Sequence, residues 1–116
     1  MASFVLSLHS SPSALSALQS LSRFAQAALK NGHRIDCVFL YQDGVYHAQD
    51  GISQPTDQLS INQLWLDLKA LSIPLLLCVT AAENRGVTAD TGLFDVAGLA
   101  EFAMKTSKAD RWVQFK

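Results

Sequence analysis

The chain has 116 residues, of which 49 % are hydrophobic and 16 % charged, and its formal net charge is -1. This length fits a single domain over residues 1–116 and leaves little room for a second. Lysine and arginine are scattered, which argues against a nucleic-acid partner, and no apolar stretch approaches the roughly 20 residues of a membrane helix. Because the N-terminus lacks the pattern of a signal peptide, we expect a cytoplasmic protein.

The first third of the chain carries strand, helix and strand signals in turn. Residues 3–8 form a short apolar run that predicts a strand. Ser11-Pro12 is expected to cap and open a helix, whose apolar residues recur at helical spacing from residue 14 to residue 29. Asn31-Gly32 should end that helix, and the run 35–41, rich in β-formers, predicts a second strand.

The middle of the chain combines a long polar segment with a helix and a strand. Residues 42–57 are polar, contain two glycines and are the longest loop candidate. Ser60 fits a capping box with Gln63, which predicts a helix whose apolar stripe continues to residue 71. The continuous apolar run 73–79 predicts a third strand.

The last third is less regular. Residues 80–90 form a short polar connection that could start with a helical turn. Asp95 is expected to cap a further helix, and the alternating run 111–115 predicts a final strand. Apolar strands separated by amphipathic helices predict βαβ units and an α/β fold with a mostly parallel sheet covered on both faces.

Functional groups of such a sheet are expected outside the carboxyl ends of its strands. Three segments meet that description: residues 9–12, 41–47 and 78–85. The candidate side chains for a site therefore come from these segments.

Cys78 closes the third apolar run, and a helical turn directly after it would favour the thiolate through the helix dipole. Arg85 would add to this field if it folded back. A thiolate can attack a persulfide or disulfide sulfur atom and pass sulfur on. The alternative is a small buried core residue, which is the interpretation we adopt for Cys37 in the middle of the second strand.

Two histidines lie in the same set of segments. His9 follows the first strand and His47 lies in the long loop, so each is either solvated or close enough to the thiol to carry a proton. Together with Asp43 and Asp50 they lack the fixed ligand spacing of a metal site. No glycine-rich phosphate motif occurs, so a nucleotide site is unsupported.

Two central stretches carry a recognisable pattern. Residues 38–46 read Val-Phe-Leu-Tyr-Gln-Asp-Gly-Val-Tyr, and residues 77–87 read Leu-Cys-Val-Thr-Ala-Ala-Glu-Asn-Arg-Gly-Val. The first resembles the segment after the second strand in the TusD/DsrE family of sulfur-relay proteins, and the second resembles the sulfur-carrying cysteine loop of that family. Residues 98–101 and 110–115 are similar to the C-terminus of the family, so the resemblance spans nearly the whole chain.

The resemblance implies a DsrE-like three-layer α/β/α sandwich of flavodoxin/Rossmann-like topology. It further implies assembly with sister subunits in a hetero- or homo-oligomer, as in the hexameric TusBCD and DsrEFH complexes, and exchange with upstream and downstream sulfur-carrier proteins. In that family a cysteine accepts persulfide sulfur and hands it on, towards 2-thiouridine of tRNA or in sulfur oxidation. No metal or organic cofactor is required, and Cys78 is the position that matches the functional cysteine.

We therefore expect a sulfurtransferase subunit that carries sulfur as a persulfide on Cys78, held at an open, electropositive edge of the sheet. The candidates for lining this site are His9, Tyr41, Asp43 and Arg85. Two alternatives stay open. One is a non-catalytic structural subunit of a DsrE-like hetero-oligomer, and the other is a small-ligand-binding flavodoxin-like domain.

Overall fold

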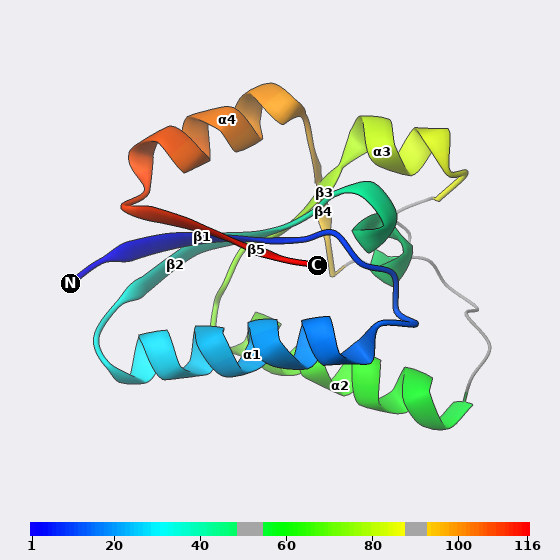
Figure 1. Cartoon of the computed structure of the whole chain (residues 1–116), viewed down its shortest axis with the longest axis horizontal. Helices are drawn as coiled ribbons and strands as arrows, with labels where there is room; N and C mark the ends of the chain where they lie inside the picture. Colours follow the sequence, from blue (N-terminus) through cyan, green and yellow to red (C-terminus); the bar gives the residue numbers. More distant parts are fainter. Residues whose placement is uncertain (49–54, 88–92) are drawn as a thin grey trace.

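The computed structural model describes residues 1–48, 55–87 and 93–116, except the side chains of residues 55–60. Within these ranges, five parallel strands form one sheet with helices on both faces (Figure 1). The strands are β1 (Ser3–Leu8), β2 (Arg34–Leu40), β3 (Leu75–Cys78), β4 (Asp95–Ala97) and β5 (Arg111–Phe115). The helices are α1 (Leu15–Lys30), the 3-10 helix η1 (Gln42–Ala48), α2 (Pro55–Ala70), α3 (Val79–Asn84) and α4 (Leu99–Lys108).

The strand order is β4-β3-β2-β1-β5, and every neighbouring pair is parallel. Helices α1 and α2 cover one face of the sheet, whereas α3 and α4 lie on the other (Figure 1). This arrangement confirms the expected α/β/α sandwich. Because the strands are parallel, all of their carboxyl ends meet at one edge of the sheet, which is where η1 and α3 begin.

The core lies between the sheet and its helices. The three central strands are almost continuously buried, as expected of strands that are covered on both faces. On α1, the buried residues Leu18, Leu21 and Ala25 follow helical spacing and pack on the sheet. The largest fully buried side chains are Trp65 of α2 and Phe39 of β2. In the part of the chain that the structure describes, no helix is long and apolar enough to cross a bilayer.

The start of α1 differs from the prediction. The helix begins at Leu15, its N-cap is Ala14, and no side chain caps it. Ser11 instead takes part in a preceding turn, in which its carbonyl oxygen accepts from the Ala14 N–H at 3.0 Å. The predicted end of the helix is confirmed, because Asn31 is the C-cap and Gly32 follows with φ of +83°.

The start of α2 was predicted too late. The helix begins at Pro55, whose fixed φ suits a first helical position, so Ser60 lies inside the helix and is not its cap. The loop predicted over residues 42–57 contains η1 at its start, and residues 49–54 of that prediction lie outside the described part of the chain.

Strand β4 was not predicted. Asp95 begins this strand and does not cap α4, whose N-cap is Gly98. The strand has 3 residues, of which Asp95 and Val96 are exposed, so it has neither the length nor the alternation of a sequence-level strand signal. Its pairing with β3, from Leu76 opposite Asp95 to Cys78 opposite Ala97, places it in the sheet.

Candidate functional site

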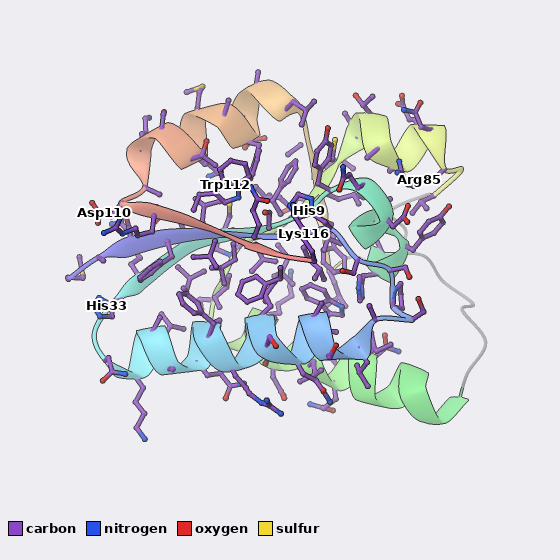
Figure 2. The ribbon with its side chains drawn as sticks, viewed as in Figure 1. His9, His33, Arg85, Asp110, Trp112 and Lys116 are labelled. Carbon is purple, nitrogen blue, oxygen red and sulfur yellow. The ribbon has the colours of Figure 1, made fainter. Side chains whose placement is uncertain are left out.

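The predicted site segments meet at the carboxyl edge of the sheet. His9 follows β1, Tyr41 follows β2 and Cys78 is the last residue of β3. Figure 2 shows His9 and Arg85 towards this end of the molecule, with His33 and Asp110 at the opposite end. The parallel strands therefore collect side chains that are up to about seventy positions apart in the sequence.

Cys78 occupies the junction between strand and helix. Its backbone is extended (φ −68°, ψ 117°), and it is the N-cap residue of α3. The Sγ atom accepts a hydrogen bond from the backbone N–H of Ala81 at 3.5 Å. The predicted helical turn after the cysteine is confirmed, and one of its free amides, the Ala81 N–H, donates to the sulfur.

The sulfur is not at an open edge, which corrects the expectation from the sequence. Cys78 is 0 % exposed in this chain, and the next buried residues, Ala81 and Ala82, belong to α3. The strand continues directly into α3 beyond the carboxyl edge of the sheet, and the Ala81 amide of its first turn lies in contact with the sulfur (Figure 1). A partner protein can reach Sγ only after a movement that exposes it.

Arg85 does fold back, the condition under which it could add to the field at the thiol, but it does so onto a carboxylate. Its Nε donates to Oδ1 of Asp43 at 2.9 Å, and another guanidinium nitrogen donates to the carbonyl oxygen of Ala81 at 3.3 Å. The ion pair joins the C-cap of α3 to the first turn of η1. Because Asp43 offsets the charge of Arg85, the edge is less electropositive than expected from the sequence.

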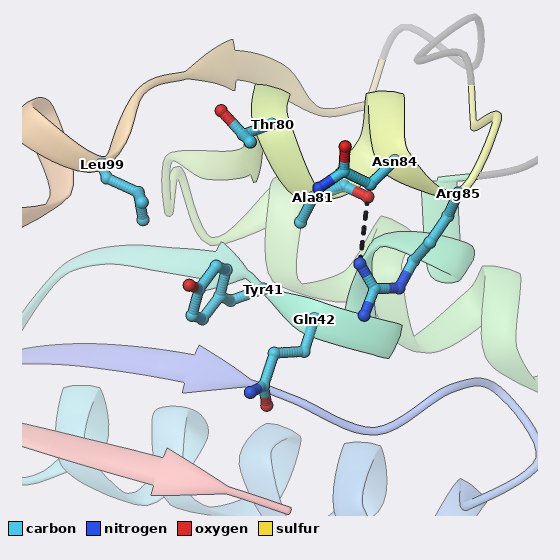
Figure 3. A pocket seen from close by; sticks show the side chains of 7 residues that line it. All are labelled: Tyr41, Gln42, Thr80, Ala81, Asn84, Arg85 and Leu99. Carbon is cyan, nitrogen blue, oxygen red and sulfur yellow. Dashed lines mark hydrogen bonds between the residues drawn. The ribbon is translucent and has the colours of Figure 1, made fainter.

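A pocket of about 150 Å³ lies beside α3 (Figure 3). It is lined by Tyr41, Gln42, Thr80, Ala81, Asn84, Arg85 and Leu99. Tyr41 and Arg85 were predicted for the site, whereas Gln42, Thr80, Asn84 and Leu99 were not. A polar residue in a loop signals no more than solvent exposure, and Leu99 comes from α4, whose approach to β2 only the tertiary structure reveals.

His9 belongs to a chain of hydrogen bonds that crosses three segments. Its Nδ1 donates to Oε1 of Gln42 at 3.1 Å, so that Nε2 accepts from the hydroxyl group of Ser7 at 2.9 Å. The indole N–H of Trp112 donates to the same hydroxyl oxygen at 2.9 Å. His9 therefore fixes Gln42, a pocket residue whose φ is 53°, and is 5.9 Å from Tyr41 between ring centroids.

His47 is not a solvated loop residue, and groups other than the thiol occupy both of its ring nitrogens. It is buried in η1, donates from Nε2 to the carbonyl oxygen of Ser10 at 3.1 Å, and accepts at Nδ1 from the indole N–H of Trp65 at 3.3 Å. Burial lowers the pKa of His47 to about 4, partly offset by the Ser10 carbonyl. His47 is thus a neutral structural residue that joins η1 to α2.

The second cysteine, Cys37, is a core residue. Cys37 is buried in the middle of β2, and burial raises the pKa of its thiol to about 11, as expected of a core residue.

Among the described residues, no group of three or more histidine, cysteine or acidic side chains could hold a metal ion. Asp50, weighed as a ligand from the sequence, lies outside that part.

One protein-family model and two named relatives match this chain over most of its length. The model of the DsrE/DsrF-like family matches residues 2–115. A protein named sulfurtransferase TusD from Proteus mirabilis (strain HI4320) is 36 % identical over 106 residues, which cover 79 % of this chain and 82 % of that protein. A second sulfurtransferase TusD, from Enterobacter sp. (strain 638), is 36 % identical over 110 residues, or 83 % and 86 % of the two chains.

Among solved structures, the crystal structure of the ychN protein from E. coli superimposes with a TM-score of 0.79. The match covers 99 % of this chain and 100 % of that one at 23 % identity, so it shows a shared fold.

Proposed function

Because the chain belongs to the DsrE/DsrF-like family, we propose that it is a sulfurtransferase subunit that carries sulfur as a persulfide on Cys78 and relays it to an acceptor protein. The single observation that supports this role best is the place of Cys78. It ends β3, caps α3 and receives the Ala81 N–H on its sulfur. The name of the relatives, sulfurtransferase, supports the same role for a chain 36 % identical to them.

The proposed transfer needs no oxidant or reductant. The thiolate of Cys78 attacks the outer sulfur atom of a donor persulfide, a new S–S bond forms on Cys78, and the S–S bond of the donor breaks. The donor leaves as a thiolate, and the proton stays on the transferred sulfur. In the second step an acceptor thiolate attacks that outer sulfur, and Cys78 is released as a thiolate. The Ala81 N–H stabilises the negative charge that returns to Sγ.

The proposal includes protein partners. We propose sister DsrE-like subunits, an upstream sulfur donor and a downstream acceptor, in a relay that ends either in tRNA 2-thiouridine or in sulfur oxidation. The low share of charged residues, 16 % against about a quarter in typical domains, supports burial of part of the surface in such an assembly.

The test uses inorganic polysulfide as the sulfur donor and intact-protein mass spectrometry as the readout. The unmodified chain and a Cys37→Ala variant should each gain the mass of one sulfur atom, and a Cys78→Ala variant should gain none. Cys37 is the matched control because it too is a fully buried strand cysteine. A Cys78→Ala variant that still gains sulfur would refute the assignment.

A second candidate function is favoured by the burial of Cys78, which is 0 % exposed. In that case the chain is a non-catalytic structural subunit of a hetero-oligomer and the thiol is inert. Alkylation under native conditions separates the two, because an inert Cys78 would react no faster than Cys37. Faster reaction at Cys78 favours the carrier.

A further inference from the structure

Transfer through Cys78 requires that something uncover its sulfur, and the structure indicates what that is. The first turn of α3 lies directly on Sγ through the Ala81 N–H. Since Cys78 is the N-cap of the same helix, the sulfur and the amide that contacts it belong to one strand-to-helix junction. Helix α3 is therefore an element in direct contact with the buried sulfur.

Helix α3 is held weakly by apolar contacts. It has 6 residues, and its buried side chains are those of Ala81 and Ala82, the smallest apolar side chains available. The pocket of about 150 Å³ lies against the same helix, so the side of α3 that faces Tyr41 and Leu99 is incompletely packed (Figure 3). Elements with little buried apolar area open at low free energy.

The far end of α3 is held by charge. Between described residues, one ion pair reaches this segment, from Arg85 at the C-cap to Asp43 of η1 at 2.9 Å. The Arg85 guanidinium also donates back to the Ala81 carbonyl, so the same side chain ties the covering turn to η1. Gly86 follows with φ of +67°, a conformation that glycine adopts without strain, and the next residue, Val87, is buried.

We propose that α3 is a lid over Cys78 and that the ion pair between Arg85 and Asp43 is the latch that keeps it closed. The use of this lid to control sulfur exchange rests on the proposed function of Cys78. A partner that presents a carboxylate to Arg85 or a cationic group to Asp43 competes with the latch and opens the lid, so docking and exposure of the sulfur occur together. While the lid is closed, exchange between the sulfur of Cys78 and small thiols in solution is suppressed.

The test measures the rate at which iodoacetamide modifies each cysteine, resolved by peptide mass spectrometry. The latch variants are Asp43→Ala, Arg85→Ala and the double variant. The matched control is Arg34→Ala, which removes an arginine from an ion pair elsewhere among the described residues, Arg34 with Asp36 at 2.7 Å, at the amino end of β2. Cys37 is the internal reference for global unfolding.

Each latch variant should modify Cys78 about threefold faster, the range expected for loss of a partly exposed ion pair. The double variant should be no faster than the faster single variant, because both substitutions remove one interaction. Arg34→Ala should leave the rate at Cys78 unchanged. Added salt should speed modification of the unmodified chain but not of the double variant. Unchanged rates in Asp43→Ala, or a parallel increase at Cys37, would overturn the latch.

The result also separates this inference from the proposed function. If Asp43→Ala exposes Cys78 to iodoacetamide but the chain gains no sulfur from polysulfide, the lid stands and the carrier role fails. A different outcome is that the unmodified chain and Asp43→Ala gain sulfur on Cys78 at the same rate and react with iodoacetamide at the same rate. In that case the carrier role stands and the lid fails.

Discussion

The two cysteines show how far a residue's role can be predicted from its position in the sequence. Cys37 was expected in the core and lies there. Cys78 was expected at the carboxyl end of a strand and before a helical turn, and both are confirmed. Its complete burial was not predicted, because exposure depends on how segments far apart in the sequence pack around the end of β3, which no local pattern reveals.

His47 is a residue whose environment was predicted wrongly from the sequence. In the sequence it is a polar residue of a polar loop, and in the structure it is buried and fully hydrogen-bonded. The signal was absent because its partners, Ser10 and Trp65, come from a different loop and a helix. A protonated His47 would place a ring N–H against the indole N–H of Trp65, so the folded protein favours the neutral ring.

This arrangement predicts a specific pH dependence of stability. The pKa of His47 is lowered to about 4 in the folded chain and returns to about 6.5 on unfolding, so the unfolded state binds the proton first as the pH falls. The contribution of the neutral ring is fully present above about pH 6.5 and is lost between about pH 6.5 and 4, by roughly 3 kcal/mol in all. A His47→Gln variant keeps a donor and an acceptor and does not titrate.

The measurement is urea unfolding of both proteins between about pH 6 and 5. The unfolding free energy of the unmodified chain should fall about 1.4 kcal/mol per pH unit more steeply than that of His47→Gln. The carboxyl of Asp110 does not interfere, since its pKa is lowered by the hydrogen bond from the Ser3 N–H and its contribution is lost only at lower pH. Equal slopes would contradict the neutral buried state.

At the scale of elements, the central strands and the bodies of the helices could be predicted, and their boundaries could not. Ser11 and Ser60 are good capping residues, yet one lies in a turn and the other inside α2. Such side chains favour caps and turns alike, and packing decides between them. Strand β4 is short and partly exposed, and its hydrogen bonds to β3 define it, which no local pattern reveals.

Gly44 is required by a close backbone contact that could not be predicted from the sequence. It lies in η1, where a Cβ atom would meet the backbone carbonyl group of Leu8, 2.9 Å from its carbon. Only a glycine lets η1 approach the end of β1 so closely, and this approach positions Asp43 for the ion pair with Arg85.

A Gly44→Ala substitution should therefore be destabilising by about 2 to 4 kcal/mol, because backbone has to move. The matched control is Gly98→Ala, where a Cβ atom meets nothing within 4 Å and φ is −92°, so the change should cost no more than about 1 kcal/mol. Chemical denaturation of the three proteins provides the comparison. Similar stability of the two variants would show that η1 is not constrained by this contact.

At the scale of the whole molecule, one property of the fold creates the candidate site. A parallel sheet has a single carboxyl edge, and His9, Asp43 and Cys78 lie at or shortly after the ends of three different strands. The sequence could predict that edge from the alternation of strands and helices. It could not predict the strand order or the pocket, because both depend on which helix covers which face and on side chains such as Leu99 that close the space.

The account as a whole depends on which sulfur atom carries the cargo. The most direct measurement treats the unmodified chain with polysulfide, traps persulfides with an alkylating reagent under denaturing conditions, and maps the modified peptides by tandem mass spectrometry. The account predicts one additional sulfur atom on the peptide that contains Cys78 and none on the peptide that contains Cys37. Extra sulfur on Cys37 alone, or on neither peptide, would contradict it.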